Sequence, residues 1–128
     1  METMVSPLAK KLKLKPGHRA AVAGAPPGYL EQLAPPADVE VSETLDGGPF
    51  DWIQVFVRTS AELAAVVEPL TAAISPTGHV WISYPKGKSI PTDLNRDSLY
   101  RTVLEAGLQG VSQVAIDDVW SALRFKNV

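Results

Sequence analysis

The segment from His18 to Ala23 restricts the fold of this chain more than any other, because it leads directly into the stretch from Gly24 to Gly28. Residues 20–23 form a continuous run of small apolar side chains, which is typical of a central strand covered on both faces. The sequence that follows, Gly-Ala-Pro-Pro-Gly, predicts a turn. A covered strand that ends in such a turn favours an α/β fold built around a mostly parallel sheet.

Extended and helical patterns alternate along the chain. The predicted strands comprise residues 18–23, 38–43, 51–57, 79–84, 110–116 and 121–126. The predicted helices comprise residues 7–14, 29–33, 61–74 and a last segment that ends at residue 106. We expect Ser60 to cap the helix at 61–74 and Pro69 to kink or break it. We also expect a turn at Pro76-Thr77-Gly78, and Thr92 or Asp93 as the cap of the last helix.

Strands that alternate with helices favour a parallel sheet with right-handed crossovers. Only residues 117–120 separate the last two predicted strands, which indicates an antiparallel hairpin. We therefore predict a three-layer, Rossmann-like α/β sheet of about six strands, mostly parallel and ending in an antiparallel hairpin. Residues 16–128 are expected to form this single domain, and residues 1–15 a basic N-terminal arm or a short helix.

Ligands of such sheets bind beyond the carboxyl ends of the strands, where the strand order reverses. This rule selects residues 24–28, 58–60 and 84–88 as one candidate rim. Within it we predict a pocket for a small anion. Its predicted members are Arg58, Tyr84, Lys86, Lys88 and Asp93. The competing interpretation is that the lysines only keep an exposed loop soluble.

Several common chemistries are not indicated. The chain has no cysteine, which excludes disulfides and thiolate catalysis and fits a reducing, cytoplasmic location. No run of 18 apolar residues is present, and the N-terminal residues lack a basic region leading into an apolar one. We therefore expect neither a membrane span nor a secretory signal.

Metal and catalytic motifs are also missing. His18 and His79 do not have the spacing of zinc ligands, and the pair Asp117-Asp118 is interpreted as structural. No Gly-x-Ser-x-Gly motif and no phosphate-binding Walker loop occur. We predict no metal site and no catalytic residue.

Charge is distributed unevenly. Up to Arg19 the chain carries five lysines and arginines and one glutamate, a balance of +4, so the remainder must carry −6 to give the net charge of −2. The basic stretch Lys10–Lys15, with His18 and Arg19, has the charge to contact phosphates. A solvated helix face is the competing interpretation. No aromatic residue is interleaved for base stacking, so we do not expect nucleic-acid binding.

The chain resembles a small, uncharacterised bacterial family over nearly its whole length. The stretches that carry this resemblance are Lys15-Pro16-Gly17-His18-Arg19, Gly48-Pro49-Phe50-Asp51, Tyr84-Pro85-Lys86, Pro91-Thr92-Asp93-Leu94 and Val119-Trp120-Ser121-Ala122-Leu123-Arg124-Phe125. More distantly, the chain is similar to the Rossmann-like core of S-adenosylmethionine (SAM)-dependent methyltransferases. Pro-Gly-x-Arg before the first strand, Phe-Asp opening a middle strand, Pro-x-Gly before the next, and a terminal hairpin all follow that plan.

The second resemblance implies a cofactor turn. Gly24 and Gly28 match the first and last glycines of the methyltransferase Gly-x-Gly-x-Gly motif, whereas Pro26 stands at the middle glycine and Val22 at the acidic position. A ribose-binding acid near the end of the second strand would be Glu43. One helix and one strand of the larger fold are expected to be missing between that strand and residues 46–51.

A proline at the middle of this turn has no N–H to offer a ligand and adds a ring. We therefore predict a degenerate, non-catalytic Rossmann-like domain that carries no cofactor and binds a small anionic ligand or a protein partner. The alternative prediction is a small SAM-dependent methyltransferase with a divergent cofactor loop, whose cofactor residues would be Gly24, Pro26, Gly28 and Glu43.

Overall fold

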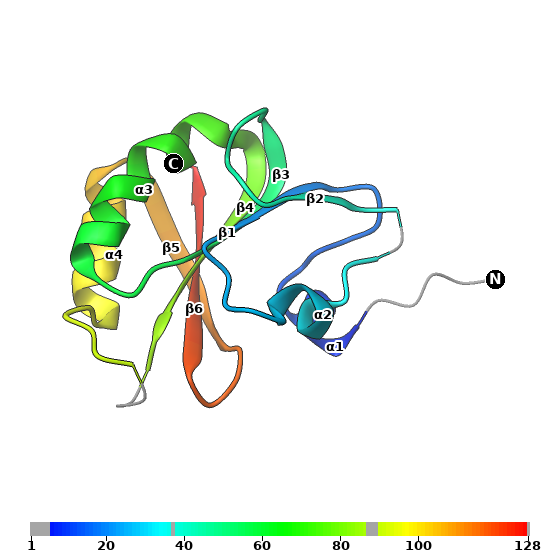
Figure 1. Cartoon of the computed structure of the whole chain (residues 1–128). Helices are drawn as coiled ribbons and strands as arrows, with labels where there is room; N and C mark the ends of the chain where they lie inside the picture. The colour runs from blue at the N-terminus through cyan, green and yellow to red at the C-terminus, as the bar shows by residue number, and fades with distance from the viewer. Residues whose placement is uncertain (1–5, 37, 87–89, 128) are drawn as a thin grey trace.

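The computed structural model describes residues 6–36, 38–86 and 90–127 (Figure 1). The helices are α1 (Pro7–Lys11), α2 (Tyr29–Leu33), α3 (Ser60–Ala73) and α4 (Arg96–Glu105). The strands are β1 (Arg19–Ala23), β2 (Glu40–Ser42), β3 (Phe50–Phe56), β4 (Ile74–Pro85), β5 (Leu108–Ala115) and β6 (Trp120–Asn127).

The six strands form one sheet in the order β2-β1-β3-β4-β6-β5. The pairs β1–β2, β1–β3 and β3–β4 are parallel, whereas β6 runs antiparallel to both β4 and β5. The strand order therefore reverses between β1 and β3, which is where an α/β sheet places its ligand. This arrangement confirms the predicted mostly parallel sheet with its closing antiparallel hairpin.

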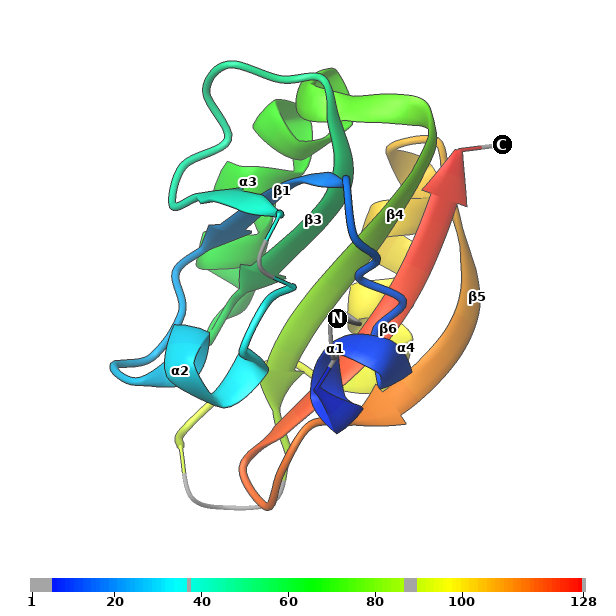
Figure 2. The same cartoon turned by 90° about the vertical axis from the view of Figure 1, so that its right-hand side faces the viewer.

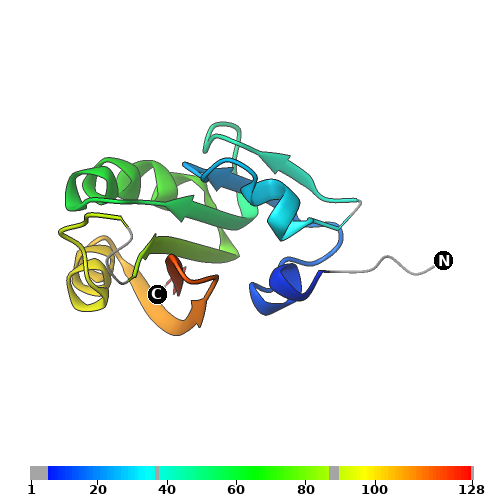
Figure 3. The ribbon, with the colours of Figure 1, turned by 60° about the horizontal axis from the view of Figure 1, so that its bottom comes forward.

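Helices cover the sheet on both faces, as Figures 1 and 3 show. One core packs α3 and α4 against residues such as Ile53, Val55 and Ile82, and the other packs α1 and α2 against Trp52 and Trp81. Both tryptophans are fully buried. The three layers follow from the alternation of the strands, whose successive side chains point to opposite faces.

The connection from α1 to β1 is held against the sheet by its backbone. The carbonyl oxygen of Leu12 accepts a hydrogen bond of 2.7 Å from each of the indole nitrogens of Trp52 and Trp81. Leu12 and Leu14 are themselves buried. Only the lysine side chains of this basic segment face solvent, since Lys10, Lys11, Lys13 and Lys15 are exposed.

Strand β4 begins earlier than predicted. Residues Pro76-Thr77-Gly78 do not form a turn but lie within the strand, which already pairs with Phe50 at Ile74. The register then shifts between Phe50 and Trp52, as it does at a β-bulge. A Cβ atom at Gly78 would lie 2.5 Å from the end of the Ile74 side chain and 3.0 Å from the carbonyl oxygen of Phe50, so this position leaves little space for a side chain.

Both long helices differ from the prediction at their first residues. The cap of α3 is Thr59, not Ser60, and its side chain accepts a hydrogen bond from the amide of Glu62. The helix continues past Pro69 to Ala73, and Leu70 and Ala73 in this last part are buried against the core.

Helix α4 begins after Asn95, not after Thr92 or Asp93. The side chain of Asn95 accepts from the amide of Ser98, and the hydroxyl of Ser98 accepts from the amide of Asn95. This reciprocal pair is a capping box. The helix stops before Gly107, which has a positive φ of 98°.

The connection from β2 to β3 carries no helix, as predicted, since residues 43–49 lie directly between the two strands. The segment contains five residues in bends or turns, which are followed by a cis Gly48–Pro49 peptide. The fold therefore has no helix between β2 and β3.

Candidate functional site at the carboxyl edge of the sheet

The carboxyl ends of β1 and β3 meet at the reversal of strand order, and the structure brings Gly24 and Arg58 together there. The Nη1 atom of Arg58 lies 3.5 Å from the carbonyl oxygen of Gly24. The hairpin between β5 and β6 closes the same edge (Figure 1). Two of the three predicted parts of the rim are therefore in contact.

Aromatic side chains support the guanidinium group of Arg58. Its Cζ atom lies 5.2 Å from the centroid of the Trp120 ring. Trp120 in turn meets the ring of Phe56 edge-on at 5.0 Å, and Phe56 meets Tyr29 at 4.6 Å. Such a cation–aromatic contact orients an arginine without using its hydrogen-bond donors.

The polar contacts of Arg58 are long. Besides Gly24, its Nη1 atom approaches Glu62 Oε1 at 3.9 Å, and both side chains are partly exposed, at 36% and 46%. An exposed pair at that distance contributes little. The guanidinium group therefore keeps most of its donors available to a bound anion.

A buried chain of hydrogen bonds lies below this edge on the α2 side. The hydroxyl of Tyr29 donates to Gln54 Oε1 at 2.6 Å, and Gln54 Nε2 donates to the hydroxyl of Ser83 at 3.0 Å. All three side chains are buried. Burial raises the pKa of Tyr29, the nearby charge of Asp117 adds to the rise, and the bond to Gln54 opposes it. Tyr29 is thus a neutral donor that fixes α2 on the sheet.

The residues predicted for the anion site at the end of β4, namely Tyr84, Lys86 and Lys88, do not lie together in one site. The backbone amide of Lys86 donates to the carbonyl of Val119 at 2.8 Å, so half-buried Lys86 is joined to the residue that precedes Trp120. Tyr84 packs in the core on the α4 side, and its hydroxyl accepts from Gln113 Nε2. Lys88 lies outside the described residues.

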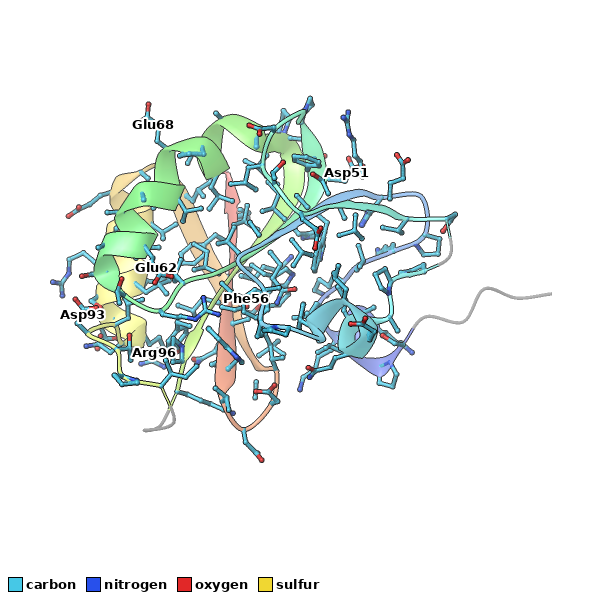
Figure 4. The ribbon with its side chains drawn as sticks, viewed as in Figure 1. Asp51, Phe56, Glu62, Glu68, Asp93 and Arg96 are labelled. Atoms are coloured by element: carbon cyan, nitrogen blue, oxygen red, sulfur yellow. The ribbon has the colours of Figure 1, made fainter. Side chains whose placement is uncertain are left out.

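Asp93 occupies the start of α3. Its Oδ1 atom accepts from the amide of Ser60 at 2.8 Å, and its Oδ2 atom accepts from the Ser60 hydroxyl. These two bonds lower the pKa of the Asp93 carboxyl. Figure 4 shows Glu62 and Asp93 at the same end of α3. The carboxylate of Asp93 therefore stands where an external anion would bind a helix N-terminus.

The turn at residues 24–28 makes contacts within the protein. A Cβ atom at Gly24 would lie 2.8 Å from the carbonyl oxygen of Phe56, so this glycine allows β1 and β3 to approach each other. The carbonyl of Pro26 accepts from the amide of Tyr29. Gly28, with a φ of 82°, precedes the five-residue helix α2 and makes no side-chain cap.

This turn differs from the cofactor turn that the methyltransferase resemblance implies. Pro26 and Pro27 supply no N–H groups, and a cavity between Gly24 and α3 measures about 230 Å³. Cofactor pockets usually start at about 300 Å³. Glu43 follows β2 as an exposed residue. No described contact joins it to the turn.

Within residues 6–36, 38–86 and 90–127, no group of three or more His, Cys, Asp or Glu side chains is arranged to hold a metal ion. Over the same ranges, none of the helices has the length and hydrophobicity that crossing a bilayer requires.

The sequence pointed to Arg58 and Lys86, but it did not point to their supporting residues. Gln54 is a polar residue inside an apolar strand, which was the available signal for a buried hydrogen-bond chain. The role of Trp120 under Arg58 depends on the register of β4 with β6, where Trp120 pairs with Pro85.

Neither a protein-family model nor a curated protein matches the sequence. The resemblance to an uncharacterised bacterial family therefore stays a prediction. Solved structures do match the fold. The ribosomal protein L11 methylase from Lactobacillus delbrueckii subsp. bulgaricus is similar with a TM-score of 0.65 and 15% identity, over 92% of this chain and 73% of the methylase.

Two further structures have similar scores. A SAM-dependent methyltransferase from Aquifex aeolicus has a TM-score of 0.61 and 15% identity, over 94% of this chain and 87% of its own. A TehB-like SAM-dependent methyltransferase from Corynebacterium glutamicum has a TM-score of 0.62 and 10% identity, over 94% and 85%. At such identities, the comparisons show that this chain has a methyltransferase-like, Rossmann-like α/β fold.

Proposed function

We propose that this protein is a non-catalytic domain that binds a small anionic ligand at the carboxyl edge of its sheet. One observation carries the proposal: Arg58 is held over Trp120, at the reversal of strand order, while its polar contacts are 3.5 Å and 3.9 Å long. A guanidinium group that is oriented but weakly engaged is suited to a carboxylate or phosphate, which it can bind through two parallel bonds.

Lys86 supports this proposal by its place. Its backbone is bonded to Val119, next to Trp120, so a second cation lies on the same stretch of rim. Asp93 is not part of the proposed site, because its carboxylate is bonded to Ser60.

Isothermal titration calorimetry with malonate, a small dicarboxylate, tests the proposal. We expect saturable binding that becomes roughly tenfold weaker or more in Arg58→Gln, since one charge-assisted pair is lost. Arg101→Gln, an exposed arginine on α4, is the matched control and is expected to bind malonate like the wild type. Equal affinities in wild type and Arg58→Gln would overturn the proposal.

The second candidate is a small SAM-dependent methyltransferase. It is supported by the fold, since matching structures are described as SAM-dependent methyltransferases. Thermal unfolding with S-adenosylhomocysteine separates the two candidates. A ligand at 100 times its dissociation constant adds about 2.7 kcal/mol of stability. A clear rise in the unfolding temperature would favour the methyltransferase, and its absence, together with malonate binding, would favour the anion-binding domain.

A further inference from the structure

A second cluster of cationic and hydrogen-bonding side chains lies away from the carboxyl edge, on the face that α1 covers. It consists of Lys13, Lys15, His18, His79 and Arg124, which we call the basic cluster. Figure 2 shows the connection from α1 to β1 passing along β4 and β6, the strands that carry His79 and Arg124. The ring centroids of the two histidines lie 6.4 Å apart.

Hydrogen bonding determines which atoms the two histidines offer. Arg124 Nη1 lies 2.9 Å from His79 Nδ1, and a guanidinium group can only donate, so this ring nitrogen accepts. The amide of Lys15 donates to His18 Nδ1 at 3.2 Å in the same way. The neutral form of each ring therefore carries its proton on Nε2, and both histidines have a donor left to offer.

Arg124 also has a donor left over. Its Nε atom is buried and has no hydrogen-bond partner among the described residues. A buried donor without an acceptor is costly, because it has lost its water without a replacement. An acceptor supplied by a ligand would remove that cost.

The charges around His79 all have one sign. Burial lowers the pKa of His79, and it is lowered further by Arg124, His18, Lys13 and Lys15, in that order. No carboxylate is among the groups that act on it. A cavity of about 390 Å³ is lined by Lys10, Lys13, Leu14, Lys15 and Pro16, so it shares two lysines with the cluster. This part of the fold therefore combines hydrogen-bond donors and positive charge beside a cavity.

We propose that the basic cluster binds the terminal phosphate of a small phosphorylated metabolite. A dianionic, tetrahedral group suits several converging donors and cations, whereas a nucleic-acid strand requires an extended basic stripe with aromatic rings for its bases. The cluster is compact, and its members include no phenylalanine, tyrosine or tryptophan. This site is separate from the proposed site at Arg58, and either can fail without the other.

An NMR titration of the histidine ring protons tests the proposal directly. The probes are inorganic phosphate and glycerol 3-phosphate, with sodium chloride at matched ionic strength as the reference. We expect the His18 and His79 signals to shift and saturate with both phosphates. We also expect phosphate to raise the pKa of His79, because a bound dianion favours the imidazolium form. Signals that do not move, or that move equally with chloride, would overturn the proposal.

A variant tests whether the cluster is the binding site. Lys13→Asn combined with Lys15→Gln removes two exposed charges, and asparagine accepts the positive φ of 62° found at Lys13. We expect phosphate affinity to fall at least about tenfold, with an unchanged unfolding midpoint. Arg101→Gln on α4 is the control and should bind phosphate normally. Equal affinity in the double variant would contradict the assignment.

Binding of a single-stranded RNA oligomer distinguishes a small phosphorylated metabolite from a nucleic-acid backbone as the source of the phosphate. We expect the small phosphates to compete with any RNA binding and the RNA affinity to depend only weakly on salt. The proposal would be overturned in favour of a nucleic-acid surface by two results together. The RNA affinity would fall with salt concentration as steeply as several phosphate contacts require, and glycerol 3-phosphate would not bind.

Discussion

At the scale of single residues, the two glycines of the first turn have different surroundings. Both have positive φ, but a Cβ atom at Gly24 would meet the backbone of Phe56 at 2.8 Å, whereas at Gly28 nothing lies within 4 Å. We expect Gly28→Ala to cost about 1 to 2 kcal/mol of unfolding free energy and Gly24→Ala more than about 3 kcal/mol. Urea denaturation measures both, and equal losses would show that Gly24 is not required for packing β1 against β3.

Tyr29 is the residue whose protonation should affect stability. Its pKa is raised in the folded state, so its neutral form contributes stability below the unfolded pKa of about 10, and that contribution is lost as the pH rises further. We expect the unfolding free energy of the wild type to fall more steeply above pH 10 than that of Tyr29→Phe. At pH 7, Tyr29→Phe should cost about 1 to 3 kcal/mol, because Gln54 Oε1 loses its donor.

Urea unfolding from pH 8 to 11 measures both effects. Tyr100→Phe serves as the control, since Tyr100 is exposed on α4 and should leave the pH dependence as it is. Parallel pH profiles of the wild type and Tyr29→Phe would contradict the role given to Tyr29.

At the scale of elements, α3 depends on a carboxylate from a distant segment. Asp93 binds Ser60 in the first turn, and its lowered pKa means that the stabilisation is present above the unfolded pKa and is lost as the pH falls through the folded one. We expect Asp93→Asn to reduce the steepness of acid unfolding and to speed hydrogen exchange in the first turn of α3. Unchanged exchange there, with α4 as the internal reference, would contradict this role.

The segment before β1 is the second element that carries a prediction. Because Leu12 accepts bonds from two buried indoles, deletion of residues 1–14 should expose Trp52 and Trp81. We expect the tryptophan emission to shift to the red and cooperative unfolding to be lost. A shortened chain that unfolds cooperatively, with unshifted emission, would show that this segment is dispensable for the fold.

Elements were predictable from the sequence to different degrees. Strand β1 was anticipated by the apolar run at residues 20–23, and the hairpin of β5 and β6 by its short connection. The cap of α4 was not, because Thr92, Asp93 and Asn95 are all good capping residues and only the bond from Ser60 to Asp93 decides between them.

At the scale of the whole molecule, the sites depend on strand register more than on local motifs. Arg58 reaches Trp120 only because β6 pairs with β4, and Arg124 reaches His79 for the same reason. Residues so far apart in sequence carry no local signal of their proximity. The mostly parallel sheet with its closing antiparallel hairpin was recognisable from the sequence, whereas the order of its strands, the basic cluster and the buried chain of Tyr29, Gln54 and Ser83 required the three-dimensional structure.

The fold also separates the two proposed sites. Arg58 and Lys86 lie at the carboxyl edge, near the closing hairpin, and the basic cluster lies over β4 and β6 on the α1 side. The two sites share no residue. Malonate and phosphate can therefore be tested on one sample, each with its own variant and with Arg101→Gln as the common control.

The most direct test is an NMR titration that follows the arginine Nε–H signals and the backbone amides together, first with malonate and then with S-adenosylhomocysteine. We predict that malonate shifts the Nε–H signal of Arg58 in a saturable way, while the amides of residues 24–28 stay in place with both ligands. Saturable shifts of residues 24–28 with S-adenosylhomocysteine, and an unmoved Arg58 signal with malonate, would contradict an anion-binding domain and point instead to a working SAM site.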